Sequence, residues 1–439
     1  MNRPPGDPVT RGTAERTPAA GGERHIPVPD PIARDYLLLA LRLDQCAPGL
    51  VDGYFGPADL KAQVDMEQLR PPARLAEDAV ALHARLASEV DDRARRRWLA
   101  AQLVALETQA RALAGDAPAY LDYVERCFDF RPSPRADAGF LEIAAQLSDM
   151  VPGRGTLPDR LGALDASLTV APDRISAVAD WLVATFRERA RRQFGLPEGE
   201  SLRVRLVRDK PWSGYNWYDG GLRSRVDLNL DLPIRAPDLI SVLAHETFPG
   251  HHLEHAWKEA DLVLTQGRLE ASVLLINTPE CMISEGLAEA GRGFAVGPAG
   301  EAHLLAELAA RAGLKAAGST EPDRLSWAER QVAIAALRRA MAEIAINAAL
   351  MRHVDAVPRE DVVAYLVDVG LMAPDRAEKR LTFIEHPLWR AYIFVYSEGE
   401  QLLRRWLDAV APGERSRRFS RLLHEQLTPG GVLTELRER

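Results

Sequence analysis

The chain has 439 residues, 46% of them hydrophobic, so it is long enough to bury one large core or two lobes and is expected to be globular. Its 55 basic and 63 acidic residues give a formal net charge of −8, which argues against nucleic acid or an anionic membrane as the main partner. The three cysteines, Cys46, Cys127 and Cys281, lie far apart, which favours neither a disulfide framework nor a thiolate zinc site.

The beginning of the chain predicts a disordered tail. Residues 1–30 are rich in Pro, Gly, Arg, Thr and Ala and hold almost no large apolar side chains. The tail has no apolar stretch of the kind found in signal peptides, and no run of 18 apolar residues occurs anywhere in the chain. The sequence therefore predicts a cytoplasmic protein without a membrane span.

The next segment, residues 31–195, predicts a helical lobe. Its stretches 36–41, 75–90 and 98–113 repeat apolar residues with helical spacing and are bounded by Pro, Gly or Asp. Near Leu202 the period changes from 3.6 to 2, and residues 215–218 lead through Asp219-Gly220-Gly221 into 226–230, as in a β-hairpin. We therefore expect a mainly α fold with a small antiparallel β-sheet, which either pairs with an extended peptide or caps the helical core.

A histidine cluster follows the hairpin. Four of the ten histidines lie within residues 245–255, interleaved with two carboxylates, and imidazole with carboxylate is a ligand set that suits zinc. A helix is expected to begin near Pro237-Asp238 and to bury Leu239, Ile240 and Leu243, so that the cluster sits on a packed element. The sequence predicts one transition metal per chain, preferably zinc, with His245 as a ligand, whereas His255 is expected at the surface or behind the ligands.

The spacing within the cluster is unusual. His245-Glu246 begins like the H-E-x-x-H motif, in which two histidines bind zinc and the glutamate works on water, but Pro249 stands where the second histidine would be. On an unbroken helix His251 would lie about 9 Å along and about 240° round from His245, and His252 about 10.5 Å along. Because Pro249 must break the helix, either His251 or His252 can return to the metal. Glu246 is the expected general base.

His-Glu-x-x-Pro-Gly-His-His, at residues 245–252, resembles the signature of the bacterial DUF885 proteins, which are of unknown function and are grouped with the gluzincin metallopeptidases. Three later segments are similar to further motifs of that family, although Leu287 replaces its Trp: Ser284-Glu285-Gly286-Leu287-Ala288-Glu289-Ala290, Tyr396-Ser397-Glu398-Gly399 and Phe419-Ser420-Arg421-Leu422-Leu423. The resemblance implies a gluzincin-like zinc metallopeptidase architecture within a catalytic region, residues 196–439.

The same resemblance implies roles for further residues. Glu285 and Glu289 lie four apart on one predicted helix face, and Glu285 matches the position from which gluzincins take a third zinc ligand. Tyr396 is the implied donor to the oxyanion of the reaction. Arg390 is a candidate to hold a substrate carboxylate.

Three functions are weighed on this basis. The first is a zinc-dependent hydrolase that cleaves the amide bond of a peptide or a small amide. The second, a di-iron carboxylate protein, requires Glu-x-x-His pairs, and none of the ten histidines has a glutamate three residues before it. The third is a degenerate, non-catalytic zincin-fold binding protein. The intact His245-Glu246 and Glu285-Gly286 favour the first, and the sequence indicates neither the substrate nor the oligomeric state.

Overall fold

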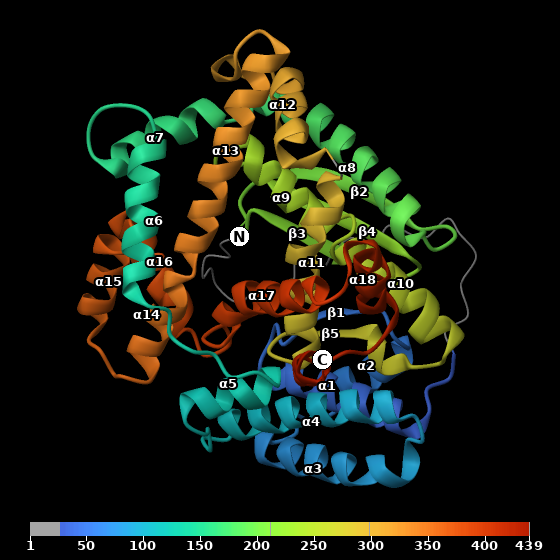
Figure 1. Ribbon diagram of the computed structural model, residues 1–439. Helices are drawn as coiled ribbons and strands as arrows, with labels where there is room; N and C mark the ends of the chain where they lie inside the picture. The colour runs from blue at the N-terminus through green and yellow to red at the C-terminus, as the bar shows by residue number, and fades with distance from the viewer. Residues whose placement is uncertain (1–26, 211, 298, 439) are drawn as a thin grey trace.

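A computed structural model describes residues 27–210, 212–297 and 299–438, and most of the predicted tail, residues 1–26, lies outside these ranges. The fold is mainly α with two small sheets, which confirms the predicted fold class (Figure 1). Within the described ranges, no helix has both the length and the apolar character needed to cross a membrane.

The segment 31–195 is helical. Its helices are α1 (Pro31–Cys46), α2 (Ala58–Met66), α3 (Pro72–Glu89), α4 (Arg93–Leu113), α5 (Tyr120–Phe128), α6 (Asp137–Met150), α7 (Leu157–Leu168) and α8 (Pro172–Phe194). The three predicted stretches lie in α1, α3 and α4 and are confirmed. Their packing does not stop at residue 195: α8 shares a core with later helices, whereas α1 and α3 to α5 share another core with helices from the second half of the chain.

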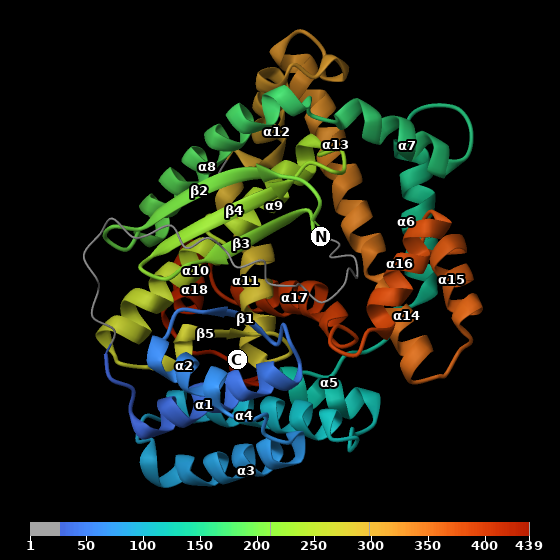
Figure 2. The same cartoon turned by 180° about the vertical axis from the view of Figure 1, so that it is seen from behind.

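The main sheet holds β2 (Ser201–Val207), β3 (Gly214–Tyr218) and β4 (Arg223–Asn229) in the order β2-β4-β3. The predicted hairpin is the antiparallel pair β3 and β4, in which Gly214 lies opposite Leu228. The expectation of a purely antiparallel sheet is wrong in one respect, because β2 runs parallel to β4. In this order β4 lies in the middle, and β3 is one of the two outer strands of the sheet (Figure 2). A second, antiparallel sheet joins β1 (Val51–Tyr54) to β5 (Val273–Leu275).

The second half of the chain is helical. Its helices are α9 (Ala236–Glu246), α10 (His251–Lys258), the π-helix η1 (Glu259–Thr265), α11 (Pro279–Val296), α12 (Gly300–Ala312), α13 (Glu321–Ala342), α14 (Ile344–His353), α15 (Arg359–Asp368), α16 (Pro374–Glu385), α17 (Val395–Asp408), α18 (Arg415–His424) and α19 (Pro429–Arg437). The 3-10 turns η2 (Leu269–Ser272), η3 (Lys315–Ala317), η4 (Tyr392–Phe394) and η5 (Pro412–Glu414) connect some of them.

Helix α9 begins as the sequence predicts. Pro237 stands in its first turn, where a missing N–H costs no hydrogen bond, and Asp238 lies near the positive end of the helix dipole. Leu239, Ile240 and Leu243 are fully buried in a core shared with α8, α11 and α12. This packing fixes the end of α9, which carries His245 and Glu246.

Helices α11 and α17 cross where two glycines meet. A Cβ atom on Gly286 would lie 2.6 Å from the backbone carbonyl of Gly399, and one on Gly399 would lie 2.7 Å from the carbonyl oxygen of Met282. Real Cβ atoms do not approach backbone so closely, so the two helices can pack in this way only because neither residue has a side chain. The crossing holds α17, which carries Tyr396, against the part of α11 that follows Glu285, and it explains why both motifs contain a glycine.

We predict that Gly286→Ala destabilises the fold by about 1–3 kcal/mol or more, because the added methyl group must push α17 away. Gly293→Ala is the matched control on the same helix, since a Cβ there meets nothing within 4 Å. It should stabilise by about 0.5–1 kcal/mol, the usual gain when alanine replaces glycine inside a helix. Urea unfolding of the two variants checks this, and equal free energies of unfolding would contradict the crossing.

Candidate metal centre

The histidine cluster is divided between two helices. Helix α9 ends at Glu246, and α10 begins at His251, after a break that contains Pro249 and a cis Phe248–Pro249 bond. A Cβ atom on Gly250 would lie 1.8 Å from the carbonyl oxygen of His245, so only glycine fits at this position. The predicted break at Pro249-Gly250 is therefore confirmed, and it turns the start of α10 back onto the end of α9.

The break brings three of the predicted ligands together. Glu285 Oε2 lies 3.2 Å from His245 Nε2 and 3.8 Å from His251 Nε2. One donor atom from each of these three residues lies within 4.8 Å of the others. Ligand atoms that share a tetrahedral ion at about 2.1 Å are about 3.4 Å apart. The spacing therefore suits a single metal ion with only small side-chain adjustments.

The donor set also fits a cation chemically. Glu285 Oε1 accepts a hydrogen bond of 2.6 Å from Tyr392 Oη, whereas the buried Oε2 has no hydrogen-bond partner in the described part of the chain. The two imidazoles lie against Oε2 without hydrogen-bond geometry. A buried polar atom without a partner costs about 1–3 kcal/mol, and more when it is charged. A metal ion at this position would remove that cost.

Carboxylates stand behind both histidines. The Nδ1 atom of His245 lies 3.2 Å from Glu289 Oε1, and the Nδ1 atom of His251 lies 3.5 Å from Glu254 Oε2 and 3.3 Å from Ser284 Oγ. Such outer partners hold a metal-binding imidazole in one tautomer and orientation. Each imidazole can thus keep its Nδ1 for the carboxylate and its Nε2 for the metal.

Glu254 is itself held by buried partners that the sequence did not single out. Its carboxylate accepts hydrogen bonds of 2.6 Å from Lys258 Nζ and 2.6 Å from Ser284 Oγ. Lys258 also contacts Glu280, whose other oxygen accepts from Trp98 Nε1 at 2.7 Å. The sequence does contain a local signal for these two residues. Glu254 follows His251 by three residues and Lys258 follows Glu254 by four, so the three side chains share one face of α10. No local signal pointed to Trp98, which comes from α4.

His252, the other histidine that the sequence left open as a ligand, lies apart from the candidate group. Its side chain is completely buried, with Nδ1 2.8 Å from Ser224 Oγ and Nε2 2.9 Å from Glu200 Oε2. Neighbouring residues of a helix point about 100° apart, so when His251 faces α11, His252 faces the sheet. His251 is therefore the histidine that the break returns to His245, whereas His252 joins α10 to β4 and to the chain before β2.

His255 is buried rather than exposed. Its ring stacks on His251 with a centroid separation of 5.7 Å and packs edge-on against Tyr218. His251, Glu254 and His255 form a second group whose spacing would suit an ion. However, Lys258 already neutralises Glu254 in this group. The first group, with its unpartnered Glu285 oxygen, therefore fits a cation better.

Glu246 lies beside the first group on the side of the sheet. A Cβ atom on Gly214, the first residue of β3, would lie 3.7 Å from Glu246 Cγ, and Asn216 Nδ2 donates to the Glu246 carbonyl at 2.7 Å. Burial raises the pKa of the Glu246 carboxyl, although His245 and His251 partly oppose this effect. The geometry leaves Glu246 next to the ligands and at the edge strand, without making it a member of the ligand group.

The two predicted residues from late in the chain are placed differently. The ring of Tyr396 has its centroid 6.3 Å from that of His245, so this residue lies at the cluster. Arg390 instead stacks its guanidinium over the ring of Tyr123 on α5, at 4.6 Å, and shows no contact with the cluster among the described residues. Arg390 lies in the turn at residues 386–391, and η4 separates this turn from Tyr396 on α17, so closeness in sequence does not bring both to one site.

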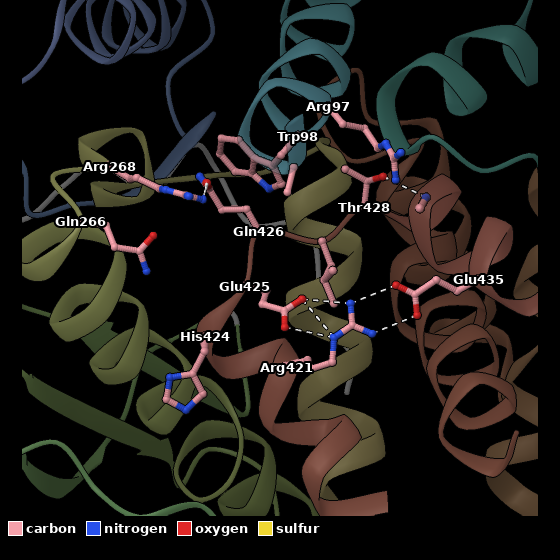
Figure 3. A pocket seen from close by; sticks show the side chains of 13 residues that line it. Arg97, Trp98, Gln266, Arg268, Arg421, His424, Glu425, Gln426, Thr428 and Glu435 are labelled. Carbon is pink, nitrogen blue, oxygen red and sulfur yellow. Dashed lines mark hydrogen bonds and ion pairs between the residues drawn. The ribbon is translucent and has the colours of Figure 1, made fainter. Parts of the chain in front are cut away.

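A separate cavity of about 290 Å³ lies between α4 and α18, lined by Trp98, Arg421 and Glu435 among others (Figure 3). Two of its three lining arginines are paired with carboxylates. Arg421 makes two contacts of 2.9 Å with Glu435, and Arg268 lies 2.8 Å from Asp92. The charges of these two arginines are therefore neutralised within the protein, unlike the donor group at the histidine cluster.

No family model matches this chain, and no curated protein matches it. Among solved structures, a candidate lipoprotein from Colwellia psychrerythraea has a TM-score of 0.50 at 13% identity, over 84% of this chain and 66% of that one. A candidate lipoprotein from Shewanella oneidensis has 0.46 at 11% identity, over 87% and 76%. An M32 carboxypeptidase from Deinococcus radiodurans R1 has 0.49 at 14% identity, over 93% and 94%.

These likenesses concern the fold alone. The Colwellia protein shares the overall architecture, and this chain spans about two thirds of its length. The resemblance to the DUF885 family stays a prediction from the motifs. The cytoplasmic location also stays a prediction. The Colwellia and Shewanella proteins are described as lipoproteins, but that description applies to them and not to this chain.

We predict that His251→Ala abolishes stoichiometric zinc binding, whereas His252→Ala keeps about one zinc per chain. The reason is that only His251 shares a donor group with His245 and Glu285. Elemental analysis after dialysis against zinc measures the content, and circular dichroism checks that both variants are folded. Loss of zinc in a folded His252→Ala protein, with full retention in His251→Ala, would contradict the assignment.

The affinity for the metal ion should rise with pH. Burial lowers the pKa of the metal-free His245 imidazole, but the carboxylates of Glu285 and Glu289 outweigh burial and raise it to about 9. Below that pH the ion must displace a proton, because imidazole binds metal only in its neutral form. We therefore expect affinity to rise from about pH 6 to pH 9 by about tenfold per unit for each proton released. Chelator competition measures this, and constant affinity over the range would refute it.

Proposed function

We propose that the protein is a metal-dependent hydrolase that cleaves an amide bond in a peptide or a smaller amide. In this proposal His245, His251 and Glu285 hold one zinc ion, and Glu246 is the general base. The observation that carries it is the convergence of one donor atom each from His245, His251 and Glu285, where Glu285 Oε2 has no hydrogen bond among the described residues. The buried carboxylate of Glu246 stands next to this group. Two neutral imidazoles and one carboxylate leave a coordination position open, as catalytic zinc sites require.

A zinc ion at these ligands would supply Lewis acidity, which activates water and polarises a substrate carbonyl. The protein would supply the proton transfers. Glu246 is adjacent to His245 but about 100° round α9, so its carboxylate can take a proton from the attacking water without occupying a ligand position. Burial raises the pKa of this carboxyl, which helps it to keep the proton until the leaving amine accepts it.

Tyr396 is the proposed donor to the oxyanion. Its ring lies beside His245, and it is carried by α17, which is fixed against α11 at the crossing of Gly286 and Gly399. A donor held rigidly where negative charge develops stabilises the transition state more than one that must reorganise. The crossing therefore positions both Tyr396 and Glu285, because each is carried by a helix that is held by this close backbone contact.

The outer edge of β3 is the proposed place where an extended substrate lies. The strand order leaves β3 paired only with β4 among the described strands, and Gly214 at its start packs against Glu246. An extended peptide that adds to this edge by backbone hydrogen bonds would pass the general base. This supports a peptide over a compact small amide as the substrate.

We also propose that the resemblance to DUF885 proteins reflects membership of that family. The glycines of the motifs are required by the packing of this fold. Gly250 permits the break after His245, and Gly286 and Gly399 permit the crossing of α11 and α17. Phe419 of the last motif would contact a Cβ added at Gly291, as would Pro249 of the break. The motifs are scattered in sequence and meet around one site.

The central test is Glu246→Gln, assayed first with a peptide library to find a substrate for the zinc-loaded protein. We predict that this variant folds and keeps its zinc while kcat falls by about 10²–10⁴, the usual contribution of a general base. Glu285→Gln is the matched control, because loss of a ligand should instead lower zinc content. Full activity of Glu246→Gln would place the base elsewhere. A wild-type protein that binds zinc but cleaves no amide would favour the non-catalytic binding protein.

A further inference from the structure

Two contacts join the segment of β1 to β3, an outer strand of the main sheet. Among the described strands β3 pairs only with β4 and β1 only with β5, and β1 lies on the side of β3 that faces away from β4 (Figure 2). Tyr215 Oη donates to Asp52 Oδ1 at 2.5 Å, and Phe55, which directly follows β1, meets the ring of Tyr218 edge-on with centroids 5.0 Å apart. An extended peptide that adds to the outer edge of β3 would therefore lie between β3 and β1.

The two contacts lie on opposite faces of β3. Asn216 Nδ2 donates to the carbonyl of Glu246, the proposed general base, at 2.7 Å. Side chains alternate along a strand, so Tyr218 shares the face of Asn216, whereas Tyr215 points to the opposite face. The contact made by Tyr215 is thus on the far side of the sheet from the base. The contact of Phe55 with Tyr218 is on the same side as the base.

The path along β3 is closed at the turn that follows this strand. A Cβ atom on Gly220 would lie 2.8 Å from Phe55 Cβ and 3.9 Å from Phe55 Cα, so the chain after β1 touches the turn. A peptide strand cannot pass between these two segments, because it needs about 4.8 Å on either side. The turn is also held in place, since the carboxylate of Glu259 accepts hydrogen bonds from the backbone of Gly221 at 2.8 Å and Leu222 at 3.0 Å.

This closed end limits the substrate on one side of the base. Asn216 contacts Glu246, and the closed end lies between Tyr218 and Gly220, so two to four residues of β3 separate the two levels. At about 3.3 Å per residue, this is about 7–13 Å of extended chain. At the other end of β3 the link to β1 runs through the tips of two side chains, on the face away from the base. A longer part of the substrate can leave in that direction.

We propose that the protein is an exopeptidase that removes fragments of about two to four residues from the amino end of an extended peptide. Antiparallel strand pairs outnumber parallel ones about two- to three-fold, so the substrate runs against β3 and its amino end lies toward Phe55 and Gly220. Hydrolysis adds the hydroxyl group of water to the carbonyl carbon of the cleaved bond and a proton to the amine of the remaining chain. The inference deepens the proposed hydrolase function and rests on it.

The test uses one unstructured peptide that the library digest shows to be cleaved. Mass spectrometry of its products should show fragments of about two to four residues from the amino end. The same peptide is then made with a small folded domain at its carboxyl end or at its amino end. The carboxyl-tagged form should be cleaved like the free peptide, and the amino-tagged form at least about tenfold more slowly, because a folded domain cannot pass the closed end. Calorimetry on the zinc-loaded Glu246→Gln protein should give the same order of binding.

Phe55→Ala probes the closed end itself. The ring of Phe55 fills the space beside Tyr218, so its removal should let longer amino-terminal fragments appear among the products. Phe130→Ala is the matched control, because Phe130 is also half-buried and packs on the same core as Phe55, and it should leave the fragment length unchanged. Circular dichroism and zinc analysis check that both variants are folded and loaded.

Cleavage in the interior of the peptide, release from its carboxyl end, or equal cleavage of the two tagged forms would overturn the inference. An unchanged fragment length in a folded Phe55→Ala protein would also overturn it. Failure of the proposed function has a different signature, because the zinc-loaded wild-type protein then cleaves none of the peptides. In that case the calorimetric comparison still decides on the closed end, and equal binding of the two tagged forms would contradict it.

Discussion

The site depends on the contact between Gly250 and the end of α9. On a continuous helix, His251 would lie about 9 Å along the axis and on another face from His245. Instead the backbone at Gly250 packs directly on the carbonyl of His245, in space that any Cβ would fill. This approach places the first turn of α10 against the last turn of α9, which is how residues six apart come to share Glu285.

The other side of the site is fixed by a second contact of the same kind. Gly286 and Gly399 let α11 and α17 touch through their backbones, so Glu285 and Tyr396 approach His245 from helices that are held by fully packed cores. Carboxylates then surround the two imidazoles: Glu285 lies in front, with Glu289 behind His245 and Glu254 behind His251. Lys258 neutralises Glu254, and the remaining buried negative charge is stable when a further cation shares it. Packing and electrostatics thus lead to the same proposal of a bound metal.

Local patterns in the sequence predicted local structure well. The helical stripes, the hairpin of β3 and β4 and the break at Pro249 each depend on a few neighbouring residues, and each is present. Long-range placement was not accessible in this way. The parallel pairing of β2, the face of α10 on which His251 falls and the separation of Arg390 from Tyr396 depend on angles between elements. Tyr392, which donates a hydrogen bond to Glu285, belongs to no motif that the sequence singled out, and only the packing of η4 against α11 reveals its role.

The most direct test of the account is the position of the metal itself. Anomalous diffraction at the zinc absorption edge, from crystals of the zinc-loaded full-length protein, locates the ion independently of any activity. The account predicts one strong peak about 2.0–2.2 Å from His245 Nε2, His251 Nε2 and Glu285 Oε2. A peak bound by His252, one enclosed by Glu254 and His255, or no peak in a fully folded protein would contradict it.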